Sequence, residues 1–205
     1  MDFSSYFAPD QYRFHYEMLD NEDEKSAYRQ ILEGLMNFKA DISVNNCSME
    51  TALRIFPLIK YDIPELFYVK NCRMAGIGQL KRCTVLPEYR FSSQVCSQTF
   101  TAMEEKYRGF FQHFRCAPEL TKELAIHRLI LSRSHYRDAG CAYSHEAPGV
   151  LLYDTGVCEG ISKAFKYLAD RLGLKSLVVQ GRTFNASDSK ANHAWNMIKL
   201  SDGCF

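Results

Sequence analysis

Two residues near the end of the chain have the types and spacing of a nucleophile and its base. Cys158 lies in the pentapeptide G-V-C-E-G at 156–160, at the first turn of a helix predicted over 158–172. A helix N-terminus carries about half a positive charge, which lowers a thiol pKa below its usual value of about 8.5. Because the thiolate is the nucleophilic form, this position favours covalent catalysis. A buried structural cysteine at a helix start is the plainer alternative.

His193 follows 35 residues later, at the start of the second strand predicted after that helix. A cysteine at a helix end and a histidine on an adjacent strand can form a thiolate–imidazolium pair. A histidine that only caps a strand end is the alternative for His193. Glu159 is an electrostatic neighbour of the thiol, or simply an acid in the first helical turn.

The remaining chemistry-bearing residues do not form a recognisable cofactor or metal motif. No two of the eight cysteines are closer than 11 residues, so no C-x-x-C exists and neither a zinc knuckle nor a thioredoxin motif is available. We expect the seven cysteines other than Cys158 to be free thiols that behave as small hydrophobes. The H-E pair at 145–146 has Gly149 where a zinc protease motif needs its second histidine. We therefore predict no metal and no cofactor.

Composition excludes several classes of protein. The chain has 205 residues, 46% hydrophobic and 24% charged, which is typical of a globular protein and not of a disordered one. Lys and Arg number 25 against 24 Asp and Glu, with no basic block to bind nucleic acid. Since neither a signal peptide nor a membrane span is recognisable, we expect a cytoplasmic protein. The oligomeric state is not predicted.

Periodicity predicts an α+β fold. The helices are expected over 22–38, 48–59 and 100–114, after Pro118, and over 158–172. Strands are expected at 66–69, within 76–91, and at 174–180 and 194–200, whereas 134–153 and 182–192 have the composition of loops. The chain ends just as the next strand should begin, so we expect the C-terminal domain to be incomplete.

These residues together resemble the transglutaminase-like superfamily. The resemblance rests on G-V-C-E-G at 156–160, L-G-L at 172–174 and H-A-W-N at 193–196, and covers about residues 117–205. It implies a papain-like core at 116–205, with the cysteine helix packed on an antiparallel sheet, after a helix-rich region of unknown role at 1–115. It also implies Cys158 as nucleophile and His193 as general base and acid. The family's third member is an Asp on the next strand, beyond Phe205, and Asp202 in the turn is a poor substitute.

The activity implied by the resemblance is acyl transfer from a protein or peptide carboxamide or amide bond to Cys158, followed by transfer of the thioester to an amine or to water. The oxyanion would be held by the Cys158 N–H and a second donor, for which Tyr153, Trp195 and Asn196 are candidates. A non-enzymatic interaction module with the same fold is the main alternative. A G-x-C-x-G nucleophile elbow, as in amidotransferases, is a lesser one, because Trp195 stands where those enzymes need Glu.

Overall fold

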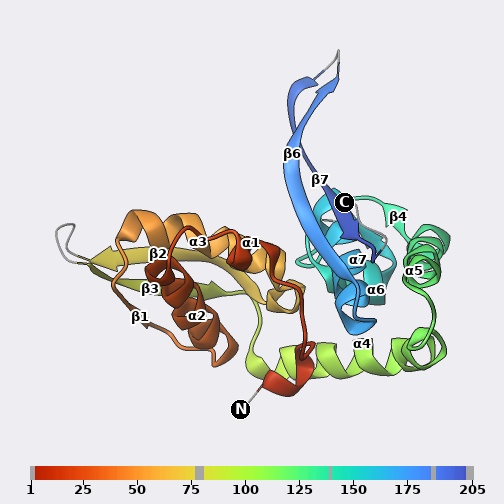
Figure 1. The fold of residues 1–205 in the computed structure, drawn as a ribbon, viewed down its shortest axis with the longest axis horizontal. Coiled ribbons are helices and arrows are strands. Elements are labelled where there is room, and N and C mark those ends of the chain that lie inside the picture. Colours follow the sequence, from red (N-terminus) through yellow and green to blue (C-terminus); the bar gives the residue numbers. More distant parts are fainter. Residues whose placement is uncertain (1–2, 77–80, 139, 186–187, 202–205) are drawn as a thin grey trace. The chain divides into compact units, whose positions relative to one another are not determined.

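The computed structural model describes residues 3–76, 81–138, 140–185 and 188–201 (Figure 1). The chain divides into two compact units. One comprises Met1–Phe7 and Arg13–Gln98, and the other comprises Ala8–Tyr12 and Thr99–Phe205. The division expected between residues 115 and 116 marks where the family resemblance starts, whereas the second compact unit begins at Thr99.

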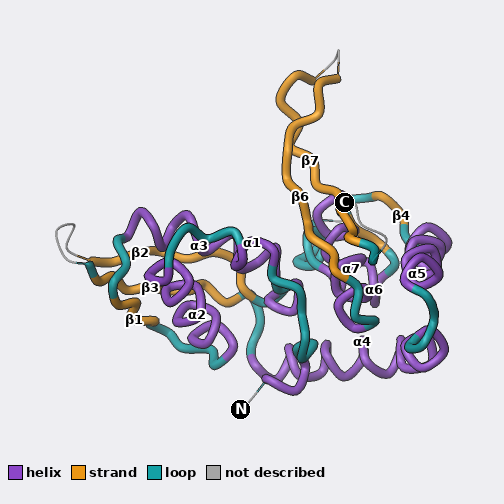
Figure 2. Tube along the Cα trace, viewed as in Figure 1, coloured by secondary structure: helices purple, strands orange, loops and turns teal. Residues whose placement is uncertain are grey.

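The first unit combines helices with a three-stranded antiparallel sheet of order β1-β3-β2, against which α2 and α3 pack (Figure 2). The predicted helices α2 and α3 are confirmed, and the side chains of Asn21 and Ser48 cap them by accepting backbone N–H bonds. The region expected to be helix-rich therefore also contains a three-stranded sheet. The elements are η1 Ser4–Tyr6, α1 Phe14–Glu17, α2 Glu22–Met36, β1 Ile42–Asn45, α3 Met49–Asp62, η2 Pro64–Leu66, β2 Val69–Gly76 and β3 Arg82–Tyr89.

The second unit is built around α7, which contacts α5, α6 and both strands of the β6–β7 hairpin. The hairpin is antiparallel, and its register pairs Val179 with Trp195 and Gly181 with His193. In Figure 1 the hairpin extends beyond the helices of its unit. The elements are α4 Ser93–Phe114, α5 Glu119–Arg133, β4 His135–Tyr136, α6 Ala147–Tyr153, β5 Thr155–Gly156, α7 Cys158–Arg171, β6 Lys175–Asn185 and β7 Asp188–Lys199.

Two loop predictions in the second unit are wrong. Residues 147–153 form α6, with Pro148 in its first turn, where a missing N–H costs nothing. The polar stretch 182–192 continues the β6–β7 ladder as far as Asn185 and Asp188. An antiparallel two-stranded ribbon can be exposed to solvent on its faces. Polar residues can therefore form its strands without the alternation of apolar and polar residues that usually identifies a strand in a sequence.

The longest helix, α4, is amphipathic. Phe100, Met103 and Tyr107 recur at three or four residues and are buried, so the predicted helix over 100–114 is confirmed and begins earlier, at Ser93. Among the described residues, no helix is both long and apolar enough to cross a membrane.

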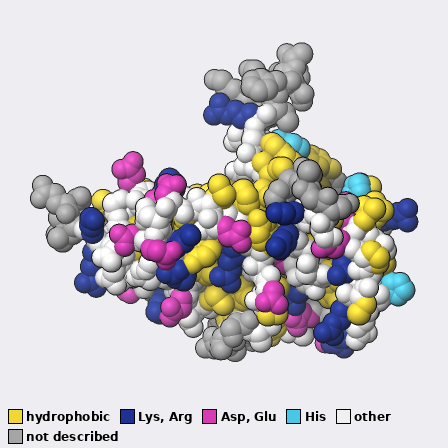
Figure 3. All heavy atoms as spheres, viewed as in Figure 1, with side chains coloured by type: hydrophobic (Ala, Val, Ile, Leu, Met, Phe, Trp, Pro, Cys, Tyr) yellow, Lys and Arg dark blue, Asp and Glu magenta, His cyan; other side chains and the backbone are white. Residues whose placement is uncertain are grey.

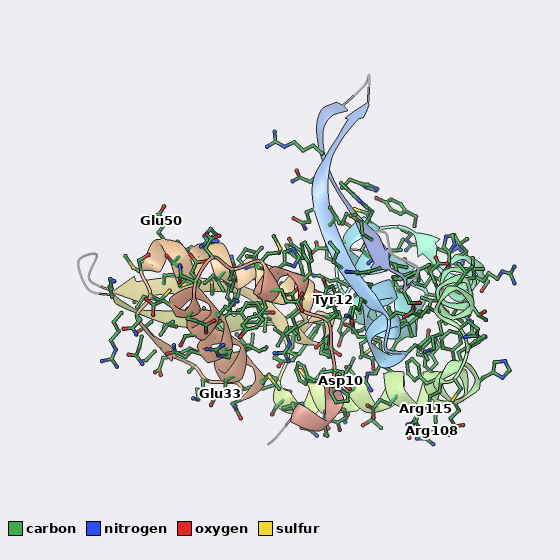
Figure 4. The ribbon with its side chains drawn as sticks, viewed as in Figure 1. Asp10, Tyr12, Glu33, Glu50, Arg108 and Arg115 are labelled. Carbon is green, nitrogen blue, oxygen red and sulfur yellow. The ribbon has the colours of Figure 1, made fainter. Side chains whose placement is uncertain are left out.

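The burial of α7 depends on the N-terminal segment 8–12. The Lys166 side chain is fully buried, and its ammonium donates to the Tyr12 carbonyl at 2.9 Å, to Asp170 at 3.0 Å and to the Ser176 carbonyl at 3.1 Å. Gln11 donates to the second Asp170 oxygen at 2.9 Å. Figure 4 labels Asp10 and Tyr12 on this segment. Three acceptors use all three ammonium protons, which makes burial of this charge tolerable.

Replacing Lys166 with Met should lower the free energy of unfolding by about 3–5 kcal/mol, because Asp170 would remain buried without its cation. Lys106→Met is the matched control. Its ammonium lies 3.4 Å from Asp154 in a partly exposed pair, and such pairs contribute about 0–1 kcal/mol. Urea denaturation of both variants measures the difference, and equal losses would contradict the assigned role of Lys166.

Candidate active site

Cys158 is the first residue of α7, and its side chain is partly exposed. The preceding N-cap residue is Val157, which makes no side-chain cap. The first-turn N–H groups of a helix have no partners within the helix, and together they form the positive end of its dipole. The thiol therefore lies at a helix N-terminus that no capping side chain covers.

A cavity of about 420 Å³ brings Cys158 and His193 together. One wall is a face of α5, a second is the face of α7 that carries the thiol, and the third is β7. Figure 3 shows hydrophobic side chains gathered, with histidine at their edge, where the hairpin meets the helices. Within the described ranges, no hydrogen bond joins the Cys158 thiol to the His193 ring. Trp195 and Asn196 also line this cavity, and Tyr153 does not.

Trp195 lies beside the imidazole. The two rings stack with centroids 6.1 Å apart and planes at 25°, as expected for residues two apart on one strand face. A Cβ on Gly181, across the ladder, would lie 2.6 Å from the indole. A glycine is therefore required there for the indole to lie across the hairpin next to His193.

The structure assigns other contacts to Asn196 and Tyr153. The Asn196 amide donates to the Ser162 carbonyl at 3.0 Å and to the Leu177 carbonyl at 3.4 Å, which ties β7 to α7. Tyr153 is exposed and stacks on Tyr143, with ring centroids 5.4 Å apart. Neither side chain is placed to donate to an oxyanion at Cys158.

Tyr136 is the functional candidate that sequence reasoning missed. Its side chain lines the cavity together with Cys158 and His193. The short parallel ladder of β4 and β5 pairs Tyr136 with Gly156, two residues before the cysteine, and this places Tyr136 at the reactive end of the cavity. Tyr136 is largely exposed, but desolvation and the neighbouring Cys158 still raise its pKa, so its hydroxyl keeps its proton. A two-residue strand is too short to show alternation, so nothing in the sequence distinguished this tyrosine.

A buried lysine fixes the end of α7 that carries the thiol. The Lys163 ammonium lies 2.8 Å from Glu146 and 2.7 Å from Glu159, and donates to the His145 carbonyl at 3.2 Å. Burial alone would lower the pKa of Lys163, but the two carboxylates outweigh it and raise that pKa. Glu159 also meets the His145 ring at 3.2 Å. Glu159 thus belongs to this ionic cluster, which joins segment 145–146 to the first turns of α7.

The glycines that flank Cys158 are explained by packing within the chain. A Cβ on Gly160 would lie 2.5 Å from the Ser144 carbonyl oxygen, which accepts a 3.0 Å bond from the Val157 N–H. A Cβ on Gly156 would lie 2.7 Å from Val150. These two glycines thus let segment 144–146 and α6 pack closely against the residues on either side of Cys158.

The geometry also bears on the nucleophile elbow and on a metal site. A nucleophile elbow needs a strand at 150–153, and those residues lie in α6. No group of three His, Cys, Asp or Glu side chains in the described part of the chain is arranged to hold a metal ion. Asp202 and the last strand expected after it lie outside the described residues.

Comparison with known proteins gives one family. Residues 112–205 match the model of the transglutaminase-like superfamily. No curated protein matches the chain. A solved structure titled "Crystal structure of a TGase" aligns with 65% of this chain and 42% of its own at 12% identity and a TM-score of 0.35, which is too low to carry an argument. This chain therefore spans less than half of that protein. Every residue that lines the Cys158 cavity falls within the matched range, so the cavity lies entirely in the part of the chain, residues 112–205, that is similar to the transglutaminase-like superfamily.

Proposed function

We propose that the protein catalyses thiol-dependent acyl transfer on a carboxamide or amide bond of a protein or peptide. The observation that carries the proposal is the cavity where the Cys158 thiol, at a helix N-terminus, shares its walls with His193 and Tyr136. A thiol on a helix packed against the strand that carries the imidazole is the arrangement expected of a papain-like core. Cys158 is assigned as nucleophile, and His193 as general base and acid.

The reaction has two halves. His193 takes the thiol proton, and the Cys158 sulfur attacks the carbonyl carbon, whose π electrons move to oxygen. The oxyanion collapses, the C–N bond breaks, and His193 returns the proton to the leaving ammonia or amine. A primary amine or water then loses a proton to His193 and attacks the thioester; the C–S bond breaks, and the departing sulfur takes the proton back from His193, which regenerates the thiol.

We assign the second oxyanion donor to the Tyr136 hydroxyl. Tyr136 lines the cavity with Cys158, and its strand pairs with Gly156, two residues before the thiol, so its hydroxyl faces the space where the carbonyl oxygen of an attacked substrate would lie. Donors that are already oriented toward developing charge stabilise the transition state without reorganisation. A phenol whose pKa is raised stays protonated and can donate throughout the neutral pH range.

The surroundings of the other cysteines favour Cys158 as the reactive thiol, with one competitor. Burial raises the pKa values of Cys47, Cys72 and Cys96 to about 12, 11 and 12, so few of these thiols are ionised near neutral pH. Cys141 differs, because it is exposed and a hydrogen bond with Ser144 lowers its pKa. A test of reactivity must separate Cys141 from Cys158.

In a Cys141→Ser background, limiting iodoacetamide at pH 7 should label Cys158 before any other cysteine, because Cys158 lies at a helix N-terminus in an open cavity with His193, whereas burial raises the pKa values of Cys47, Cys72 and Cys96. Mass spectrometry of the digested protein locates the label. Cys116 is the internal control, since it is exposed and outside the cavity. Labelling of Cys116 ahead of Cys158 would contradict the nucleophile assignment.

The wild-type chain should attach a fluorescent primary amine to a glutamine-containing protein or cleave a quenched peptide. Cys158→Ser and His193→Gln should each lower the rate by about 10³-fold or more, as removal of a paired nucleophile or base does, whereas Cys116→Ser should leave it unchanged. Absence of both activities in the wild type, together with an unreactive Cys158, would favour the non-enzymatic module.

Tyr136→Phe should lower kcat by about 10²-fold, the loss typical of one oxyanion donor. Alkylation of Cys158 by iodoacetamide forms no oxyanion, so its rate should change far less. Tyr153→Phe is the matched control and should match wild type in both assays, since Tyr153 lies outside the cavity. A parallel fall in kcat and alkylation would show that Tyr136 acts on the thiol instead.

A further inference from the structure

We propose that the cavity selects peptide acyl donors that carry a bulky apolar residue near the reacting carboxamide and a basic residue about three positions from it. This inference rests on the proposed function and assigns the substrate class of the same site. It depends on the direction of the cavity, the chemistry of its walls and the charge at its far end.

The direction of the cavity follows from the antiparallel course of α5 and α7. Lys122, near the start of α5, donates to the Leu172 carbonyl at the end of α7 at 2.9 Å. At the other end, Tyr136 follows α5 and pairs with Gly156, which lies two residues before the start of α7. The cavity therefore has a reactive end at Cys158 and a far end near the first turns of α5.

The walls between these ends are apolar and partly open to solvent. Leu131 is 69% exposed and Trp195 is 40% exposed, although both line the cavity beside the candidate nucleophile. Exposed apolar surface grouped in a concave site is typical of a surface that binds an apolar ligand. The wall side chains are Ile130, Leu131, Ile161, Phe165, Trp195 and Ile198.

The far end carries a carboxylate. Glu123 and His127 lie four residues apart on the face of α5 that continues to Leu131. Glu123 makes no ion pair within the described part of the chain. Glu123 and Leu131 are eight positions apart on the helix, which corresponds to a rise of about 12 Å along its axis. Three residues of an extended peptide span about 10 Å, which is a similar length. A peptide with its carboxamide at Cys158 would thus bring a residue three positions away to Glu123, where a Lys or Arg side chain would pair with the carboxylate.

The test uses glutamine peptides that differ at two positions, with Leu or Asp next to the glutamine and Lys or Glu three residues away, on either side. When the two varied residues lie on the side of the glutamine that enters the cavity, N-terminal or C-terminal, kcat/KM should be about 10-fold or more higher with Leu than with Asp. On that same side, kcat/KM should be several-fold higher with Lys than with Glu. Leu131→Asp should remove the preference for Leu, and Glu123→Lys should reverse the preference for Lys over Glu. Leu120→Asp and Glu105→Lys are matched controls, exposed and outside the cavity, and should keep both preferences.

Binding separates this inference from the catalytic proposal. Trp195 is the single tryptophan of the chain and lines the cavity, so its fluorescence reports binding of the same peptides to the Cys158→Ser variant. Selective binding without turnover by wild type would support the inference and contradict the catalytic proposal. Turnover of all peptides at equal rates, or equal binding of all of them, would overturn the inference.

Discussion

Two ammonium groups buried on one helix determine how the second unit is assembled. Lys163 and Lys166 are both completely buried on α7, and an uncompensated charge in such a place costs several kcal/mol. Each ammonium therefore needs three oxygen acceptors, and α7 alone cannot supply them. Its own Glu159 and Asp170 supply some, and the others come from segments distant in sequence: residue 12, segment 145–146 and Ser176. Satisfying these charges fixes the segments around α7 and leaves the thiol at its N-terminus partly exposed.

This requirement also explains how a short strand can carry a candidate catalytic group. The ionic cluster around Lys163 holds segment 144–146 against Gly160, and the Ser144 carbonyl in turn accepts the Val157 N–H. Residues 155–156 are thereby fixed close to the helix start and form a two-residue ladder with β4. This two-residue ladder places Tyr136 in the wall of the cavity that holds the thiol. The position of Tyr136 is thus determined by the segments packed around its short strand, and not by a long strand ladder.

The parts of the fold that could be predicted are those with strong local rules. The period of α7, its end at Gly173 with φ of 73°, and the Asn21 and Ser48 caps of α2 and α3 all follow from local sequence. The helix α6 was missed because Pro148 and Gly149 suggest a loop, although proline is well tolerated in a first helical turn. Cys158 and His193 could be named from residue type and spacing, and the structure places both in one cavity. Tyr136 could not, since its role depends on a contact made by tertiary packing.

The attachment of residues 8–12 to the second unit has a consequence for synthesis of the chain on the ribosome. These residues are synthesised before their partners Lys166 and Asp170, which lie 154 and 159 residues further on. The residues between segment 8–12 and Lys166 include most of the other unit, Arg13–Gln98. That unit can become compact before segment 8–12 contacts α7. Contacts of such long sequence separation close slowly, because the entropy of the intervening loop is lost before they form. The second unit can therefore complete the contacts of Lys166 only after translation has passed Ser176, and until then residues 8–12 lack their partners on α7.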